Sequence, residues 1–208
     1  MFDTKQIEQD FFRCMCLCHD VTRISDRNGK QFLTGASQDE LCLLEMAERD
    51  RRDVGFFVDR DSSTFTIEIN GQKEKYKNIK FYDFDSARKM MTRVVKNLNT
   101  GIVYVMAKGA DSAIFEKCVS RKQEPSEGKS RTFLPQEMQV MTEIENYASN
   151  GFRTLTFAMK ILETDQIDGN FSQEEIESNF TLLGASCVED LLQTDVSRCL
   201  NDFKQAKI

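Results

Sequence analysis

The sequence predicts an α+β fold in which a mainly antiparallel twisted sheet is flanked by helices. Residues 64–69 alternate strictly between polar and apolar side chains, and the Asn70-Gly71 pair that follows is the strongest short signal for a hairpin. Further strand-like runs follow one another through short turns, with helical patterns before and after them. The chain of 208 residues has no linker long enough to divide it, so we expect one domain over residues 1–208.

Helices are expected where apolar residues recur at helical spacing between start and stop signals. Pro135 suits the first turn of a helix, and Asn150-Gly151 ends the same segment. Ser172 followed by Glu175 has the form of a capping box. The expected helices cover residues 3–21, 41–52, 112–118, 135–148 and a final one beginning at 188–192.

Strands are expected in short runs rich in β-branched and aromatic residues. A turn at Asn28-Gly29 and a charged stretch over residues 121–131 are expected to be loops, the first within a polar segment from Arg23 to Lys30. The expected strands cover residues 56–58, 64–69, 72–76, 81–84, 92–96, 102–107, 153–161 and 180–185.

Composition restricts the classes of function. An apolar fraction of 40% supplies a core, and a formal net charge of −6 gives no general attraction to nucleic acid or to an anionic membrane. No window approaches the roughly 18 apolar residues that a membrane span needs. The segment from Met1 to Lys5 lacks the pattern of a signal peptide. We expect a soluble, monomeric fragment that could have been cut from a membrane protein.

The seven cysteines do not suggest a disulfide framework and favour a reduced, cytosolic protein. Cys14, Cys16 and Cys18 precede His19, the single histidine, which raises a zinc hypothesis. The usual zinc pattern has a wider cysteine spacing and a second ligand pair, and neither is present. Buried thiols in a helix are the favoured interpretation, and we expect no metal site.

Lys108 and Gly109 directly follow the expected strand at residues 102–107, and this junction is the first candidate for ligand binding. A lysine beside a backbone without a side chain can approach a phosphate or a ring face closely. A phosphate loop of the Walker type is rejected. Gly128-Lys129-Ser130 resembles its end, but the glycine required at position 123 is a glutamine.

Three other segments each leave two interpretations open. Phe84, which precedes Arg88 and Lys89, belongs either to the core or to a surface on which a base stacks. The segment from Ser37 to Glu40 is either a capping box or a source of a carboxylate that accepts from the amino group of a base. Arg153 is either a solvated arginine at a strand start or a clamp for phosphate.

Taken together and in order, these segments resemble the nucleotide-binding domain of P-type ATPases. Three segments match motifs of the whole family: Lys108-Gly109-Ala110-Asp111, Phe84-x-Ser86-x-Arg88-Lys89-x-Met91 and Gly151-Phe152-Arg153-Thr154-Leu155. Three more are similar to the phospholipid-flippase branch: Cys18-His19, Ser37-Gln38-Asp39-Glu40 and Leu183-Gly184-Ala185-x-x-Val188-Glu189-Asp190-x-Leu192-Gln193. The chain departs from the family at Gln38, at Leu41-Cys42 and at Met90, which stand in place of proline, Gly-Ala and arginine.

The resemblance implies a role in ATP binding for nine residues. Phe84 would stack on adenine, and Glu40, with Asp39, would face its amino edge. Lys108 would lie beside the base and toward the phosphates, with Gly109 allowing close approach. The remaining members would line the pocket or reach the phosphates: Ser86, Lys89, Arg153 and Thr154.

The resemblance also implies partners. The domain would hold ATP, with Mg²⁺ in the full-length protein, and present the γ-phosphate to an aspartate on a separate phosphorylation domain. The family's D-K-T-G-T string, which carries that aspartate, does not occur here, so we expect no catalysis by the fragment alone. Residues from about 181 to 208 would return toward the phosphorylation domain. The actuator domain of the same chain and a β-subunit are further implied partners, and the whole would be a cytosolic domain of an integral membrane protein.

Two alternatives stay open at this point. The first is the same domain from another branch of the family, such as an ion pump. The second is a degenerate domain that no longer binds nucleotide and serves as a regulatory or interaction module. The departures at Gln38, Leu41-Cys42 and Met90 support this second alternative.

Overall fold

The computed structural model describes residues 4–51, 53–118, 135–162 and 171–207. Its helices are α1 (Thr4–Leu17), α2 (Gln38–Asp50), α3 (Asp111–Lys117), α4 (Pro135–Ser149), α5 (Gln173–Ile176) and α6 (Val196–Gln205). Its strands are β1 (Thr22–Ser25), β2 (Gln31–Thr34), β3 (Gly55–Arg60), β4 (Thr64–Ile69), β5 (Gln72–Asp85), β6 (Met90–Asn97), β7 (Val103–Gly109), β8 (Arg153–Leu162) and β9 (Thr181–Val188). The expected loop over residues 121–131 lies outside these ranges, as does Gly128-Lys129-Ser130.

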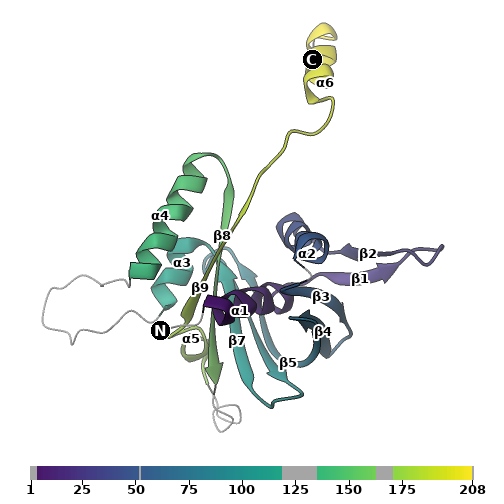
Figure 1. Ribbon diagram of the computed structural model, residues 1–208. Helices are drawn as coiled ribbons and strands as arrows, with labels where there is room; N and C mark the ends of the chain where they lie inside the picture. The colour runs from purple at the N-terminus through teal and green to yellow at the C-terminus, as the bar shows by residue number, and fades with distance from the viewer. Residues whose placement is uncertain (1–3, 52, 119–134, 163–170, 208) are drawn as a thin grey trace, which may run out of the picture.

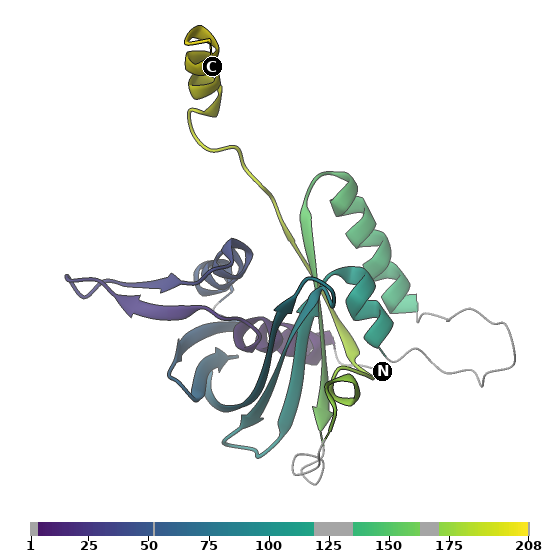
Figure 2. The same cartoon turned by 180° about the vertical axis from the view of Figure 1, so that it is seen from behind.

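Seven strands form one curled sheet whose spatial order, β3 to β9, is also their order in the sequence (Figures 1 and 2). Every pair of neighbouring strands in this sheet is antiparallel. The strands β1 and β2 form a separate two-stranded hairpin that projects beside α2. The predicted α+β class, with a mainly antiparallel sheet flanked by helices, is confirmed.

The β4–β5 hairpin forms as the local sequence predicts. Burial along β4 alternates, because Phe65, Ile67 and Ile69 point into the core. The turn residues Asn70 and Gly71 have φ angles of 50° and 75°. Positive φ at both central positions is the geometry of a type I′ turn, which matches the twist of the two strands.

One long strand, β5, replaces the two separate strands expected at residues 72–76 and 81–84. Its ladder with β6 continues across the intervening residues through register shifts between Asn78 and Lys80 and between Tyr82 and Asp85. These irregularities bend the strand without ending it, which explains why alternation is lost in the sequence between the two predicted pieces.

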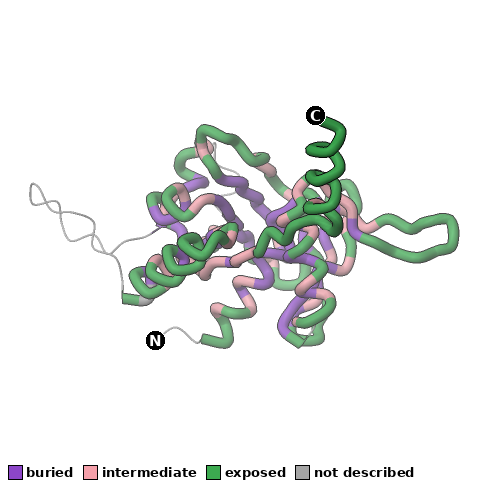
Figure 3. Tube along the Cα trace, turned by 90° about the horizontal axis from the view of Figure 1, so that it is seen from above, coloured by how far each residue is buried: buried purple, intermediate pink, exposed green. Residues whose placement is uncertain are grey.

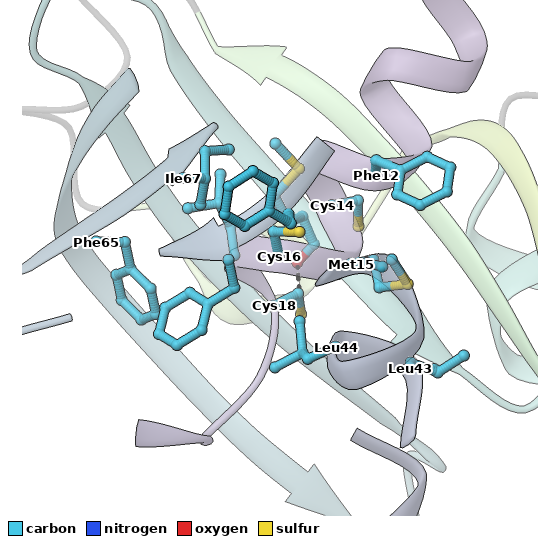
Figure 4. Packing of buried hydrophobic residues seen from close by; sticks show 14 of the residues in the cluster. Phe12, Cys14, Met15, Cys16, Cys18, Leu43, Leu44, Phe65 and Ile67 are labelled. Atoms are coloured by element: carbon cyan, nitrogen blue, oxygen red, sulfur yellow. Dashed lines mark hydrogen bonds between the residues drawn. The ribbon is translucent and has the colours of Figure 1, made fainter. Parts of the chain in front are cut away.

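The largest apolar cluster lies where α1 and α2 pack on one face of the sheet (Figure 4). Phe12, Met15 and two cysteines of α1, together with Cys18 just after it, share this cluster with Leu43 and Leu44 of α2 and the inward side chains of β4. A second cluster on the opposite face joins Ile114 of α3 and Ile176 of α5 to the central strands. The sheet is therefore covered on both faces near its middle.

The first helix ends earlier than expected, at Leu17 rather than near Val21. The ring of His19 explains this, because its Nδ1 accepts a hydrogen bond from the Val21 N–H at 2.9 Å and its Nε2 lies 2.9 Å from the Cys16 oxygen. These local bonds turn the backbone out of the helix and into β1.

The segment from Arg23 to Lys30, expected to be a polar loop, instead forms much of the β1–β2 hairpin. The expected turn is present, with Gly29 at a φ of 77°. Asp26 stabilises it by accepting hydrogen bonds from the Asn28 and Lys30 N–H groups. Short paired strands of four residues carry too little alternation to be recognised in a polar sequence.

The remaining helices agree with prediction except for the last. The capping box at Ser172 and Glu175 is present, and α4 begins at Pro135. The helix expected to begin at residues 188–192 is wrong. Val188 still pairs with Arg153 in the sheet, and the helix begins only after Asp195.

Helix α6 stands away from the body of the protein at the end of an extended segment (Figures 1 and 3). None of its residues is buried, and Leu200 and Phe203 are exposed. Leu191 and Leu192 in the preceding segment are also exposed. Among the described helices, none has the length and apolar character required to cross a bilayer.

Candidate functional site

Lys108 occupies the end of β7 and is almost completely buried, with 6% of its surface exposed. Its Nζ donates a hydrogen bond of 2.6 Å to Glu40 Oε1. Burial of an ammonium group requires such a partner, because desolvation of an isolated charge is costly. The ammonium group has three N–H donors, so two remain after the bond to Glu40.

Glu40 lies in the first turn of α2, where Ser37 caps the helix by accepting from the Glu40 N–H at 3.3 Å. The predicted cap is confirmed, but the Glu40 side chain does not complete a capping box. Its second oxygen, Oε2, accepts a hydrogen bond of 3.0 Å from the Asp20 N–H. The carboxylate is thus fixed between the α1–β1 junction and Lys108, and each oxygen keeps a further lone pair.

A second ion pair joins the same helix start to the sheet. Arg153, the first residue of β8, donates from Nη2 to Asp39 Oδ2 at 2.7 Å. Its Nη1 lies 3.5 Å from Asp190 Oδ1. Arg153 remains half-exposed, so it is a surface cation that two carboxylates hold in place. The next residue, Thr154, is partly buried and pairs with Cys187 of β9.

Phe84 lies at the end of β5, and 58% of its surface is exposed. This excludes the interpretation of Phe84 as a core residue. Ser86 and Lys89 are exposed in the turn that joins β5 to β6. Asp85 shapes this turn by accepting from the Ala87 N–H at 2.6 Å, and Lys89 adopts a φ of 54°. An exposed aromatic side chain next to a hydrogen-bonded turn is available for stacking.

The structure gives Gly109 a packing role that the sequence did not reveal. A Cβ atom at this position would contact the Lys89 carbonyl oxygen and lie 2.7 Å from the Met90 Cα. The Lys89 oxygen also accepts a hydrogen bond of 2.9 Å from the Ala110 N–H. Gly109 therefore permits the β5–β6 turn to lie directly against the end of β7.

The predicted residues meet at one end of the sheet. Lys108 pairs with Met91 of β6, and Gly109 pairs with Met90, so the end of β7 adjoins the start of β6 and the β5–β6 turn. By strand spacing, β5 and β7 lie about 10 Å apart across β6. The structure connects Glu40 to Lys108 and Asp39 to Arg153 directly. Phe84, Ser86 and Lys89 approach from the β5 side without a hydrogen bond to these four residues.

Arg88, the neighbour of Lys89 in the predicted segment, points away from Lys108 and Glu40 and toward Glu177. It donates to the buried carboxylate of Glu177 at 2.5 Å and to the Asp83 carbonyl oxygen at 2.6 Å. A cavity of about 560 Å³ lies beside this pair. Its lining includes Ala87 and Glu116 but none of the nine predicted residues.

Cys14, Cys16 and Cys18, in α1 and just after it, form no metal centre in the part of the chain that the structure describes. The thiols of Cys14 and Cys18 instead lie within hydrogen-bonding distance of backbone carbonyl oxygens of the sheet. Burial raises the pKa of the Cys18 thiol to about 11 and that of Cys14 well above its ordinary value. Buried, protonated thiols fit the favoured interpretation.

Two groups of this site were not predicted from the sequence. They are the Asp20 backbone N–H, which bonds to Glu40, and the Asp190 carboxylate near Arg153. Asp190 lies in the matched segment from Leu183 to Gln193, but that match assigned it no role at the site, and both groups act through contacts between distant segments. The Cys18-His19 match to the flippase branch lies next to Asp20 and is the nearest available signal.

Comparison with known proteins places this chain in a family. The family described as P-type ATPase, cytoplasmic domain N, matches residues 8–195. Human phospholipid-transporting ATPase IH is 29% identical over 236 residues, which cover 98% of this chain and 19% of that protein. The phospholipid-transporting ATPase dnf2 of Schizosaccharomyces pombe is 32% identical over 221 residues, covering 96% of this chain and 14% of that protein.

A third relative is human "Probable phospholipid-transporting ATPase IM", which is 31% identical over 219 residues. Those residues cover 96% of this chain and 17% of that protein. The chain thus spans less than a fifth of the length of these relatives. It belongs to the cytoplasmic domain N family of P-type ATPases and is related to the phospholipid-transporting ATPases.

Proposed function

We propose that this domain binds ATP at the end of β7 and serves a phospholipid-translocating P-type ATPase. The observation that supports the proposal most directly is the buried pair of Lys108 and Glu40, which lies two strands away from the exposed ring of Phe84. A cation, a carboxylate with free lone pairs and an open aromatic face are the groups that an adenine nucleotide requires.

Each group has a separate task in this proposal. The Phe84 ring stacks on adenine, while Glu40 and Asp39 accept from its amino edge. The remaining N–H donors of Lys108 point toward the base or the phosphates. Arg153, with Lys89 from the β5–β6 turn, attracts the phosphate chain, since a guanidinium group matches phosphate in forked geometry. Ser86 and Thr154 complete the polar lining.

In the full-length protein this domain would position ATP rather than cleave it. Phosphoryl transfer depends on holding the γ-phosphate in line with its acceptor, here an aspartate on a separate phosphorylation domain. Mg²⁺ would enter with the nucleotide phosphates. Lipid translocation, the membrane location and the actuator domain belong to the remainder of a longer chain.

The exposed C-terminal segment supports a connection to another domain. Residues 181–188 are a strand of this sheet, but the apolar side chains of Leu191, Leu192, Leu200 and Phe203 contact nothing that would bury them. Because Thr181–Val188 belong to the sheet as β9, we propose that the return segment expected from about residue 181 begins only after residue 188 and packs on the phosphorylation domain of the same chain. The relatives are more than five times longer than the region matched, which leaves room for that domain.

Binding can be tested by titrating the isotope-labelled chain with ATP and following backbone and side-chain chemical shifts. We expect the largest changes at Phe84, Lys108 and Arg153. Phe84→Ala should weaken ATP binding by roughly tenfold or more, because stacking on one base contributes about 1–3 kcal/mol.

Ile79→Ala is the matched control, since Ile79 is another exposed apolar residue of β5. It should leave ATP binding unchanged. Unchanged chemical shifts at millimolar ATP would contradict the proposal and favour a regulatory or interaction module that does not bind nucleotide. Shifts confined to the cavity beside Arg88 and Glu177 would instead place a ligand on the other side of the β5–β6 turn.

A further inference from the structure

Arg93 is a buried cation in the middle of β6, with 3% of its surface exposed. It lies between Phe81 of β5 and Met106 of β7 in the sheet. Among the described residues, no carboxylate lies within ion-pair distance of its guanidinium group. Since desolvation makes such a position unfavourable, the side chain requires compensating contacts that hold it in one geometry.

Aromatic rings and two hydrogen bonds supply that compensation. The guanidinium carbon lies 3.9 Å from the centroid of the Phe81 ring and 4.7 Å from that of Phe65. Its Nη1 donates to Asn78 Oδ1 at 3.3 Å, and its Nη2 donates to the His19 carbonyl oxygen at 2.8 Å. The bond to His19 is the shorter one, and it joins β6 to the α1–β1 junction.

A continuous path of contacts runs from this bond to the proposed nucleotide site. His19 is followed by Asp20, whose N–H donates to Glu40 Oε2 at 3.0 Å. The other oxygen of Glu40 accepts from Lys108 Nζ at 2.6 Å. The His19 carbonyl and the Asp20 N–H belong to the same peptide group. Arg93 therefore binds the oxygen of this group, while its N–H binds Glu40.

Other contacts leave this junction little freedom to move independently. Both ring nitrogens of His19 contact backbone groups, and the ring packs edge-on against Phe57 at 4.6 Å. Arg60 donates to Asp20 Oδ1 at 2.8 Å from the opposite side. A rigid junction transmits the position of Arg93 to the Glu40 carboxylate.

We propose that Arg93 is a positioning residue for the ATP site, acting by fixing the His19–Asp20 peptide so that its N–H orients Glu40 toward Lys108. The proposal rests on the proposed function of this site, and it assigns to Arg93 a task at a distance from the nucleotide. Hydrogen bonds of this kind orient a group that contacts a ligand and are weakened together when one member is lost.

The first test uses the chain without nucleotide, so that it is independent of ATP binding. Arg93→Met keeps most of the side-chain volume but removes both donors. We expect amide hydrogen exchange at Asp20 to become about tenfold faster, as loss of a hydrogen bond of ordinary strength allows. We also expect the ¹⁵Nζ resonance of Lys108 to shift.

Val95→Ala is the matched control. Val95 is buried on the same face of β6 two residues away, so its truncation loosens the core without touching His19. It should change neither the amide hydrogen exchange at Asp20 nor the ¹⁵Nζ resonance of Lys108. Unchanged signals in Arg93→Met, or equal changes in both variants, would overturn the positioning role.

Arg93→Lys keeps the charge but has a single donor nitrogen in place of the guanidinium fork, and should give smaller changes of the same kind. If Arg93→Met does not fold, this variant decides the matter: altered signals at Asp20 and Lys108 support the proposal, and unaltered ones overturn it.

The second test measures ATP affinity. Arg93→Met should weaken ATP binding by about tenfold, and by much less in a Glu40→Gln background, because the two residues act along one path. Equal effects in both backgrounds would overturn the proposal. If the unmodified chain binds no ATP, the proposed function fails, while the nucleotide-free signals still decide whether Arg93 positions Glu40.

Discussion

Lys108 and Glu40 are 68 residues apart in the sequence and are joined by a hydrogen bond of 2.6 Å beneath the surface. Burial gives this pair a structural role in addition to any contact with a ligand. From the sequence alone, loss of Lys108 is expected to reduce affinity rather than to affect the fold. The position of both side chains in the interior adds a cost to stability, because either partner left alone is a buried charge.

Lys108→Met should therefore lower the free energy of unfolding by about 3–5 kcal/mol as well as abolish tight ATP binding. Urea denaturation followed by circular dichroism measures the change. The double variant Lys108→Met with Glu40→Gln should lose less stability than the sum of the single variants, since neither charge is then unpaired.

Arg49→Ala is a suitable comparison, because Arg49 forms an exposed ion pair with Asp50 on α2. It should leave the unfolding curve unchanged. If Lys108→Met also left the unfolding curve unchanged, the buried pair would not contribute to the stability of the folded state, and the prediction would be wrong.

Arg153→Ala should reduce affinity for ATP much more than affinity for adenosine. The reason is that Arg153 is a half-exposed cation whose proposed target is phosphate. Stability should change by less than about 1 kcal/mol, because exposed ion pairs contribute little. Calorimetric titrations with the two ligands at several salt concentrations measure the difference.

Arg51→Ala provides the control for Arg153. Arg51 also lies at the end of an element and pairs with an exposed carboxylate, that of Glu8. It should affect neither ligand. Equal losses of adenosine and ATP binding in Arg153→Ala would assign Arg153 to the base rather than to the phosphates.

His19 should make stability depend on pH. Burial lowers the pKa of His19 well below its ordinary value of 6.5, with the nearby charges of Lys108 and Arg93 acting in the same direction. Below pH 6.5 the unfolded chain binds a proton that the folded chain does not, so stability falls as pH falls. The expected slope approaches about 1.4 kcal/mol per pH unit.

Denaturation curves at intervals between about pH 6.5 and 5.5 measure this slope above the range in which most carboxylates titrate. His19→Gln should be less stable at neutral pH but nearly independent of pH in that window, because His19 is the single histidine. The same slope in both proteins would show that another group is responsible.

The cysteines should differ sharply in reactivity. Cys42 and Cys199 are exposed and should be alkylated by iodoacetamide in the folded protein. Cys14, Cys16 and Cys18 should react only on unfolding, since they are buried and their pKa values are raised by desolvation. Mass spectrometry of peptides from timed samples measures the order. Rapid labelling of Cys16 would contradict the packing of α1.

Features that depend on a few adjacent residues could be predicted from the sequence. The Asn70-Gly71 turn and the alternation of β4 are set by backbone geometry and burial within one hairpin, and both were predicted correctly. The cap at Ser37 and the capping box at Ser172 are equally local.

Features that depend on contacts between distant segments could not be predicted. Glu40 fits a capping box by spacing, but Lys108 and the Asp20 N–H compete for its carboxylate in the folded chain. The helix expected near Val188 fails for the same reason, because pairing with Arg153 extends β9. The motif residues are recognised through their resemblance to a family, because no local pattern distinguishes them from ordinary core, cap and surface residues.

The sequential order of the strands has a consequence for how the chain folds. Each of β3 to β9 pairs with strands adjacent in the sequence, so the sheet can grow one hairpin at a time as the polypeptide emerges from the ribosome. Helix α1 precedes these strands in the sequence but packs against β3, β4, β7, β8 and β9. The apolar face of this helix is therefore fully sheltered from water only after β9, the last strand of the sheet, has been synthesised.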